Sequence, residues 1–225
     1  MSIKRRVIII ANGNFEHKDF YNDIIREDDF IISVDGGVKH LEKIGKVPDL
    51  MIGDFDSIEL DKLKFYEKQG IPIKRFPQDK DYTDTELALR EAKRISSEVV
   101  LIGAFGKRMD HTFANIYILV EAKKLGLDME LINMYHRVFL VEEKQKKYIP
   151  GKIGDIVSIF PFPISSGITT YGLKYALEND TMKFGYARGV SNIKVQEDAW
   201  IFVNTGSLLT FIVQKEVENE NRAYK

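Results

Sequence analysis

Residues 30–56, FIISVDGGVKHLEKIGKVPDLMIGDFD, decide the fold class of this chain. The stretch begins with a mostly apolar run, residues 30–34, in which Ser33 is the one polar residue, and closes on a second run, residues 50–52. Continuous runs of this length are typical of strands that are buried on both faces of a sheet. Between them, apolar residues follow helical spacing up to Gly45, a residue type that commonly ends a helix. A strand, a helix and a second strand in this order predict a parallel pair with a crossover helix.

The same alternation continues on both sides of this stretch. Residues 83–86, TDTE, form a capping-box pattern that predicts the start of a helix. We therefore expect an N-terminal, mostly parallel sheet with helices on its faces, which is an α/β fold. The further strands are expected at residues 7–11, 71–76 and 99–103, and the further helices around residues 60–66, 83–95 and 113–120.

The character of the chain changes after about residue 135. Helical periodicity disappears, and short apolar runs recur between glycines and prolines, which predicts a C-terminal all-β sandwich. We therefore expect an α/β nucleotide-binding domain over residues 1–135 and a β-sandwich domain over residues 136–225, with a frayed tail from Lys215. The strands of the second domain are expected at residues 138–141, 156–160, 168–177, 193–196, 199–203 and 208–213.

Composition excludes several classes of function. The chain has 225 residues, 33 Lys and Arg against 34 Asp and Glu, and a formal net charge of -1, so we expect no nucleic-acid partner. There is no cysteine, which excludes disulfides, thiolate metal sites and a cysteine nucleophile. The four histidines show no His-x-x-x-His spacing. Any metal would therefore have oxygen ligands, which favours Mg²⁺ or a similar hard cation.

The N-terminus does not predict a targeting segment or a membrane anchor. The basic residues 4–6 precede an apolar run of five residues, which is too short for a signal peptide. No stretch approaches the roughly 20 apolar residues that span a bilayer. We expect a cytoplasmic protein without a membrane partner.

The positions of the acidic residues are the main functional signal. In an open α/β sheet, ligands bind at the carboxyl ends of the strands. Many carboxylates on one edge repel one another unless a cation joins them, and a divalent metal that also binds phosphate oxygens resolves this repulsion. The acids that follow predicted strands are Asp35, Asp54, Asp56, Asp79, Asp81, Asp84 and Asp110.

Some of these acids also have ordinary structural interpretations. Asp84 lies in the first turn of a predicted helix, where the helix dipole favours an acid. Asp35 precedes two glycines and suits a turn, and Asp79 lies in a charged loop typical of solvated surface. Asp54 and Asp56, two residues apart in a tight loop, suit a metal better than a cap.

Two glycine-containing loops are candidates for phosphate binding. Residues 103–111, GAFGKRMDH, run from a strand into a helix, and Arg108 could pair with a phosphate there. The glycine spacing matches neither of the common nucleotide-binding patterns. His111 alone is more typical of a cap or core residue. Residues 12–14, NGN, form a similar candidate loop, although an ordinary turn has the same composition.

Three short motifs follow one another along the chain, residues 53–57 (GDFDS), 79–84 (DKDYTD) and 103–111, and Ser191-Asn192 lies near the C-terminus. They resemble the ordered motifs of the thiamine pyrophosphokinase family. Each motif is short, but the three in this order and spacing are specific. The resemblance covers nearly the whole chain, including the α/β domain followed by a β-sandwich.

The resemblance implies an activity. Members of the family transfer the terminal pyrophosphoryl unit of ATP to the hydroxyethyl group of thiamine, giving thiamine diphosphate and AMP. It also implies Mg²⁺ as cofactor, and a homodimer with sites between the α/β domain of one subunit and the sandwich of the other.

The candidate site residues fall into three groups. The resemblance implies catalytic roles for Asp54, Asp56, Asp81 and Asp84, the first three as metal ligands. ATP and phosphate binding are expected at Asn12, Gly13, Asp35, Gly36, Ser57, Lys80, Thr83, Gly103, Gly106 and Arg108. Thiamine binding is expected at Asp110, His111, Ser191 and Asn192.

Two other interpretations and one structural question stay open. A haloacid-dehalogenase-like phosphohydrolase would also place Asp54 after a strand, as its nucleophile, but the late β-domain does not fit it. A non-catalytic thiamine or nucleotide sensor is the third interpretation.

Trp200 lies early in the chain for a residue that stacks on thiamine and suits packing, which leaves Tyr171, Tyr175 and Phe211 as candidates for stacking. The sequence also leaves open which aspartate acts as the base.

Overall fold

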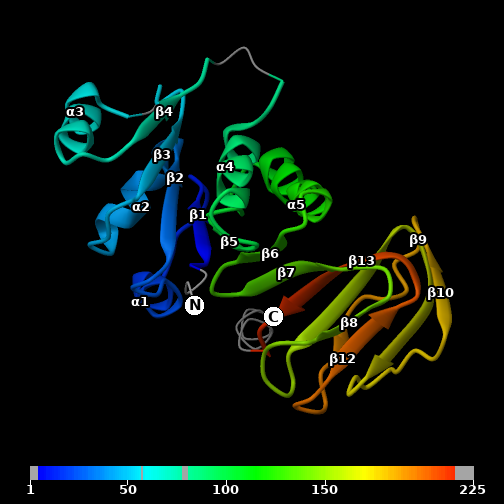
Figure 1. Ribbon diagram of the computed structural model, residues 1–225. Coiled ribbons are helices and arrows are strands. Elements are labelled where there is room, and N and C mark those ends of the chain that lie inside the picture. Colours follow the sequence, from blue (N-terminus) through cyan, green and yellow to red (C-terminus); the bar gives the residue numbers. More distant parts are fainter. Residues whose placement is uncertain (1–4, 57, 78–80, 216–225) are drawn as a thin grey trace. The chain divides into compact units, whose positions relative to one another are not determined.

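The computed structural model of the protein describes residues 5–56, 58–77 and 81–215 (Figure 1). The chain divides into two compact units, Met1–Met134 and Tyr135–Lys225. Each unit has its own hydrophobic core. Within the described residues, no helix is long and apolar enough to cross a membrane.

The first unit contains a parallel sheet. Its strand order is β4-β3-β2-β1-β5-β6, and every neighbouring pair in this series is parallel. β1 and β3 are buried along their whole length, as expected of strands covered on both faces. The prediction of a parallel α/β sheet is confirmed. The strands are β1 (Val7–Ile10), β2 (Phe30–Val34), β3 (Leu50–Gly53), β4 (Ile73–Arg75), β5 (Glu98–Ile102) and β6 (Asp128–Ile132).

This strand order creates a topological switch point. From β1 the chain adds β2, β3 and β4 on one side, and later adds β5 and β6 on the other side. The loops that follow β1 and β5 therefore leave the sheet in opposite directions, and the crevice between them is the usual ligand site of such sheets. Both predicted glycine loops, residues 12–14 and 103–106, lie at this point.

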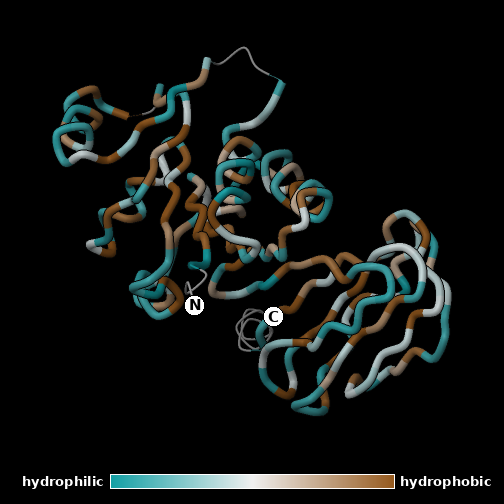
Figure 2. Tube along the Cα trace, in the orientation of Figure 1, coloured by the Kyte–Doolittle hydropathy of each residue, from teal (hydrophilic) through white to brown (hydrophobic). Residues whose placement is uncertain are grey.

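The helices pack on both faces of the sheet. On one face, Tyr21 of α1 and Leu41 of α2 join Ile8 and Ile10 of β1 in one buried cluster. Figure 1 shows α4 and α5 on the other side, and Figure 2 shows apolar residues concentrated on the central strands. The helices are α1 (Lys18–Ile24), α2 (Val38–Lys43), α3 (Leu60–Lys68), α4 (Asp84–Lys93) and α5 (Met109–Lys124), and the 3₁₀ helix η1 (Asp35–Gly37) precedes α2.

The capping box at α4 forms as predicted. The Glu86 N–H donates to the Thr83 side-chain oxygen at 3.2 Å, and the Thr83 N–H donates to the Glu86 carboxylate at 2.7 Å. These bonds satisfy two backbone donors that the first turn of a helix leaves unpaired. The side-chain oxygen of Thr83 is therefore already engaged at the helix start.

The helix at residues 113–120 is confirmed, but its apolar face is largely exposed. Phe113 is 59% exposed and Tyr117 is 46% exposed, and their rings contact each other edge to face. The buried positions of α5 are instead Thr112, Ile118, Leu119 and Ala122. Apolar spacing thus indicated the helix without identifying the side that packs on the sheet.

The second unit is built on one long strand, β9 (Ile156–Tyr171). Its first part pairs antiparallel with β13, and its last residues pair antiparallel with β12. β9 thereby belongs to two sheets, β7-β13-β9 and β8-β12-β9, while β10 and β11 also pair with it. The other strands are β7 (His136–Val141), β8 (Gln145–Tyr148), β10 (Asp180–Lys183), β11 (Asn192–Ile193), β12 (Trp200–Val203) and β13 (Thr205–Val213).

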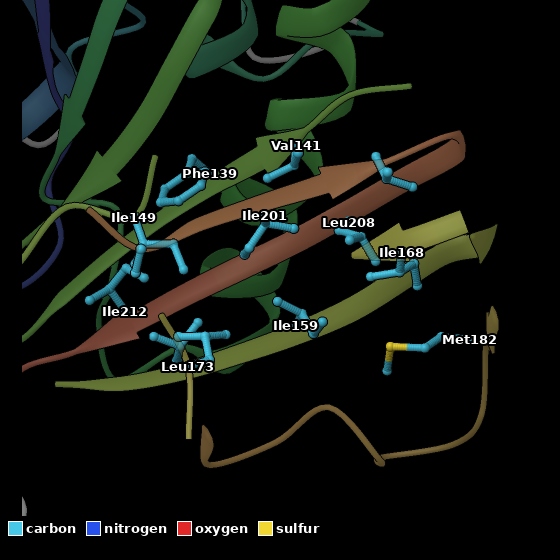
Figure 3. Packing of buried hydrophobic residues seen from close by; sticks show 13 residues of the cluster. Phe139, Val141, Ile149, Ile159, Ile168, Leu173, Met182, Ile201, Leu208 and Ile212 are labelled. Atoms are coloured by element: carbon cyan, nitrogen blue, oxygen red, sulfur yellow. The ribbon is translucent and has the colours of Figure 1, made fainter. Parts of the chain in front are cut away.

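A hydrophobic core fills this second unit (Figure 3). Phe139, Ile159, Ile201 and Leu208 come from four different strands, and each is no more than 4% exposed. Side chains from several strands that meet in one core are typical of a sandwich. The expectation of a C-terminal β-sandwich is confirmed.

Several elements differ from the sequence-based prediction. β9 joins two expected strands into one, and of the expected strand at residues 168–177 only its first four residues, up to Tyr171, are in β9. The pattern missed β8 (QKKY) and β10 (DTMK) because their residues are mostly polar. It also missed α1 and β6, which are short and contain charged residues. The predicted tail lies mostly beyond residue 215, outside the described residues.

Candidate active site

Two of the predicted acidic residues meet where β2 and β3 end. Asp35 follows β2 with a φ of 43°, in the left-handed region, and is partly buried. Its carboxylate accepts a hydrogen bond from the Asp54 N–H at 3.2 Å. A Cβ at Gly53 would overlap this carboxylate, so only glycine allows this approach. The structure therefore brings the Asp35 carboxylate to the backbone of Asp54, where the two neighbouring strands end.

The loop that carries Asp54 and Asp56 is anchored by the residue between them. Phe55 is 4% exposed and packs with Val38 and Met51 in a buried cluster. Its φ of 59° turns the backbone sharply, and the Asp56 N–H donates to Asp54 Oδ1 at 3.1 Å. The buried ring fixes the loop, while Asp54 stays half-buried and Asp56 exposed. Such an arrangement presents carboxylate oxygens at the sheet edge.

Backbone hydrogen bonds join the two glycine loops at the switch point. The Gly13 N–H donates to the Gly103 carbonyl at 2.8 Å, and the Asn14 N–H donates to the Phe105 carbonyl at 2.6 Å. A Cβ on Gly13 would overlap both carbonyl oxygens, and a Cβ on Gly103 would overlap the Ala11 carbonyl. Glycine at these two positions thus allows the loops after β1 and β5 to approach each other closely. The N–H groups of Gly13 and Asn14 are used inside the protein.

Helix α5 supports the second of these loops. The Gly106 N–H donates to Thr112 Oγ1 at 3.2 Å, and Asn115 Nδ2 donates to the Ala104 carbonyl at 2.7 Å. Thr112 and Asn115 are not among the predicted site residues. Their signal was available, because two polar residues three apart on a helix face the loop before it.

The loop after β2 lies against the loop after β1. Gly36 lies in η1, the turn after β2, and a Cβ there would overlap the side-chain amide of Asn12. Asn12 and Gly36, both predicted to bind phosphate, are thus neighbours. Loops after β1, β2 and β5 converge at the switch point.

The start of α4 holds the remaining predicted acids. Asp84 occupies the first turn and is partly buried, and Asp81 is exposed in the segment that precedes the helix. Ser57 and Lys80, both predicted to bind phosphate, lie outside the described residues, as does Asp79.

Arg108 and Asp110, predicted to bind phosphate and thiamine respectively, form an ion pair with each other. Arg108 Nη2 lies 2.5 Å from Asp110 Oδ2, with side chains 70% and 63% exposed. The hydrogen bond from Arg108 lowers the pKa of Asp110 below its usual value, and the carboxylate raises the pKa of Arg108. His111 Nε2 lies 4.0 Å from the same carboxylate. Both charges are accessible, so a phosphate could compete for the guanidinium.

The donor set at this edge is of the kind that holds a hard cation. Carboxylate oxygens are the ligands that Mg²⁺ prefers, usually with water and substrate phosphate oxygens as the others. Among residues 5–56, 58–77 and 81–215, no three histidine, aspartate or glutamate side chains are grouped closely enough to hold a metal ion. Any cation bound at this edge would therefore need further ligands from phosphates or water.

A buried histidine packs against the segment that follows β1. His40 on α2 is 7% exposed, and its ring stacks on Phe15 at a centroid distance of 4.6 Å. Neither ring nitrogen has a hydrogen-bond partner among the described residues. Burial, followed by the charge of Lys43, lowers the pKa of His40 to about 4. The residue is therefore neutral in the folded protein near pH 7.

This histidine predicts a loss of stability in mild acid. Because its folded pKa is depressed, the unfolded chain binds a proton more readily, and stability falls as pH drops from about 6.5 towards 4. The free energy of unfolding should decrease by about 2 kcal/mol between pH 7 and pH 5 through His40 alone. Urea denaturation of His40→Phe, which keeps a ring against Phe15, should show a smaller decrease. The exposed His111→Gln variant is the control, and an unchanged pH dependence in His40→Phe would contradict the assignment.

The second unit carries the last two predicted residues. Ser191 has a φ of 60° and its N–H donates to Ser158 Oγ at 3.0 Å. Asn192 begins β11, and its side chain bonds to the backbone of Tyr175. Trp200 stacks on Tyr171 at 5.9 Å, with Lys146 Nζ 4.1 Å from the ring centre, which agrees with a packing role.

Comparisons with known proteins match both units. A family model described as thiamin pyrophosphokinase, catalytic domain, matches residues 21–131, and one described as thiamin pyrophosphokinase, vitamin B1 binding domain, matches residues 140–209. Thiamine pyrophosphokinase 2 of Oryza sativa subsp. japonica is 30% identical over 168 residues, covering 68% of this chain and 63% of that protein. Thiamine pyrophosphokinase of Bacillus subtilis is 29% identical over 163 residues, 72% of this chain and 76% of that one. The matched part of the rice relative is less than two thirds of its length.

Solved structures show the same fold. A crystal structure of thiamine pyrophosphokinase from Bacillus subtilis superimposes with a TM-score of 0.82 at 24% identity, covering 93% of this chain and 99% of that one. Thiamin pyrophosphokinase from Candida albicans gives a TM-score of 0.75 at 20% identity, covering 94% and 89%. Fold and site together define a two-domain protein with a parallel α/β unit, an acidic strand edge and a β-sandwich. The chain belongs to the thiamine pyrophosphokinase family. This confirms the resemblance, and the phosphohydrolase and sensor interpretations gain no support.

Proposed function

We propose that this chain transfers a pyrophosphoryl group from ATP to thiamine, giving thiamine diphosphate and AMP. One observation carries the proposal. In a chain whose two units match the catalytic and vitamin B1 binding domains of one family, Asp35 and Asp54 meet beside the switch point of the parallel sheet.

The described residues suggest how ATP is bound. The loops after β1, β2 and β5 approach closely enough to form a firm surface, because their glycines allow backbone contact. Since the Gly13, Asn14 and Gly106 N–H groups donate within the protein, these residues would shape the phosphate site rather than donate to phosphate. Charge neutralisation then falls to Arg108 and to a cation held by Asp35, Asp54 and Asp56. Asn12, Gly36, Gly103, Ser57, Lys80 and Thr83 stay predictions as phosphate-binding residues.

The reaction itself needs positioning, charge neutralisation and a base. The hydroxyl oxygen of thiamine attacks the β-phosphorus of ATP, and its proton passes to a carboxylate of the acidic set. The new oxygen–phosphorus bond forms as the bond from the β-phosphorus to the oxygen bridging the α-phosphorus breaks, and AMP leaves. A divalent cation such as Mg²⁺, when bound, would neutralise charge on the phosphate oxygens. Asp81 and Asp84 are proposed to complete the acidic set from the start of α4.

Asp110 is proposed to face thiamine, because the thiazolium is a cation and a carboxylate is its natural partner. Its low pKa keeps it ionised through the neutral range. His111, Ser191 and Asn192 are the other residues proposed to border thiamine. A homodimer and a cytoplasmic location stay predictions that follow from the family resemblance and the sequence.

The direct test is product analysis. Purified protein incubated with ATP, Mg²⁺ and thiamine should give thiamine diphosphate and AMP in equal amounts by chromatography, and EDTA should abolish both. Thiamine monophosphate with ADP would contradict pyrophosphoryl transfer. Phosphate release that does not need thiamine would favour a phosphohydrolase, and thiamine binding without any product would favour a sensor.

A further inference from the structure

The loop that follows β1 is anchored by one aromatic residue. Asn12 and Asn14 are exposed and Gly13 is partly buried, whereas Phe15 is buried. Among residues 12–20, all of which the structure describes, Phe15 is the only buried one. The hydrogen bonds of Gly13 and Asn14 join this loop to the loop after β5. Phe15 therefore fixes the other end of the loop, where it packs in the buried cluster of β1.

The ring of Phe15 stacks on two other buried rings. It lies on Tyr21 of α1 at a centroid distance of 3.9 Å, with 15° between the ring planes. It lies on His40 of α2 at 4.6 Å, with 5° between the planes. Tyr21 is 1% exposed and His40 is 7% exposed. Aromatic pairs stabilise a structure beyond the area that they bury, so these contacts favour one position of Phe15.

His40 belongs to a part of the chain that is itself fixed on the sheet. The turn η1 precedes α2, and a Cβ on Gly37 of this turn would overlap the Ile10 carbonyl oxygen at the end of β1. The same turn begins with Asp35, whose carboxylate accepts the Asp54 N–H. The stack of His40 on Phe15 thus connects the loop after β1 to the turn that carries Asp35.

His40 meets Phe15 as an uncharged ring. Burial lowers its pKa to about 4, and the charge of Lys43 acts in the same direction. The backbone of Gly13 is near enough to raise this pKa, but neither ring nitrogen makes a hydrogen bond to the described residues. A buried polar group without a partner lowers stability, so stability alone would favour an apolar side chain here.

Resting on the proposed function, we propose that His40 is a positioning residue for ATP, which acts through Phe15. Its ring holds residues 12–14 in the conformation that receives the phosphates. The apparent affinity for a ligand falls with the fraction of the protein that is in the binding-competent conformation. Without the ring, the exposed loop would populate other conformations before ATP binds, and ATP would bind more weakly. His40 itself makes no contact with ATP.

Two apolar variants test this proposal, because only one of them keeps a ring. His40→Leu and His40→Phe both remove the unpartnered nitrogens and fill the site, so neither should lower the melting temperature. Calorimetry with ATP and Mg²⁺ should show a Kd of ATP raised about 5-fold in His40→Leu, which is the loss of one aromatic pair. In His40→Phe the Kd should stay within about 2-fold of the wild type. KM for thiamine should not change in either variant.

Two further changes serve as controls. Ile25 is 3% exposed and lies in the same buried cluster as Phe15, so Ile25→Ala should lower the melting temperature and leave the Kd of ATP unchanged. The double variant Phe15→Leu/His40→Leu should bind ATP no more weakly than Phe15→Leu alone, because residues that act through one contact are not additive.

Several results would overturn the inference. A wild-type Kd of ATP in His40→Leu would exclude a positioning role for the ring, and loss of folding in that variant would make the ring a structural requirement only. A Kd in His40→Phe as high as in His40→Leu would show that a ring nitrogen is needed. Effects that multiply in the double variant would show that His40 acts independently of Phe15. In each case ATP binding and thiamine diphosphate formation by the wild type would stand, whereas absence of both in the wild type would overturn the proposed function as well.

Discussion

Asp54→Asn should lower kcat/KM for thiamine diphosphate formation by about 10²- to 10³-fold or more. The substitution keeps the size of the side chain and an oxygen that can accept the Asp56 N–H, so the loop fixed by Phe55 should keep its shape. What is lost is one negative charge beside Asp35, where a cation and the ATP phosphates are proposed to lie. The measurement is product formation by chromatography over a range of Mg²⁺ concentrations, and the variant should need more Mg²⁺ to reach its maximal rate.

Asp61→Asn is the matched control for this prediction. Asp61 lies in the first turn of α3 with its side chain 95% exposed, and its substitution removes the same charge away from the switch point. Its activity should equal that of the wild type. If Asp54→Asn kept more than about a tenth of wild-type kcat/KM, a metal-binding role for Asp54 would be untenable. Equal melting temperatures for both variants would show that the lost activity is not lost folding.

The fold could be predicted from the sequence where burial dominates. Strands such as β1 and β3 are buried along their whole length, so their apolar runs are continuous and visible without other information. β8 and β10 stayed hidden because partner strands, rather than their own polar residues, determine their conformation. The same reason explains β9, which continues past its prolines because β13 pairs with Pro161 and Phe162, and β10 pairs with β9 from Ile164 onward.

The candidate site was likewise predictable from the sequence only in part. The acids after β2 and β3 were predictable, because carboxyl ends of parallel strands lie on one edge of a sheet. The contact between the Gly13 and Gly103 loops was not, since residues 90 positions apart give no local signal of a hydrogen bond. The use of the Asn192 side chain was hidden for the same reason, because its partner Tyr175 lies 17 residues away. Residue types thus indicated where chemistry could occur, and tertiary contacts decide which of those groups are available.

Gly103→Ala should destabilise the protein by about 3–5 kcal/mol. Two costs add at this position. Gly103 has a φ of 70°, where a side chain is strained, and a Cβ there would overlap the Ala11 carbonyl oxygen. Relief requires the loops after β1 and β5 to separate, which would weaken the hydrogen bond from the Gly13 N–H to the Gly103 carbonyl. Urea denaturation at pH 7 would measure the loss, and thiamine diphosphate formation should fall with it because the two loops meet at the proposed phosphate site.

Two other glycines separate these costs. Gly106→Ala changes the same loop, but its Cβ would meet only ordinary contacts, the nearest at 3.6 Å from Gly13 Cα, so stability should change by less than about 1 kcal/mol. Gly45→Ala carries the strain of a φ of 66° with no neighbour within 4 Å of its Cβ, so it should lose about 1–2 kcal/mol. The excess loss in Gly103→Ala over Gly45→Ala then measures the overlap with Ala11 alone. If the two variants lost the same amount, the close approach of the β1 and β5 loops would not be a tight constraint, and the proposed phosphate site would have to tolerate their separation.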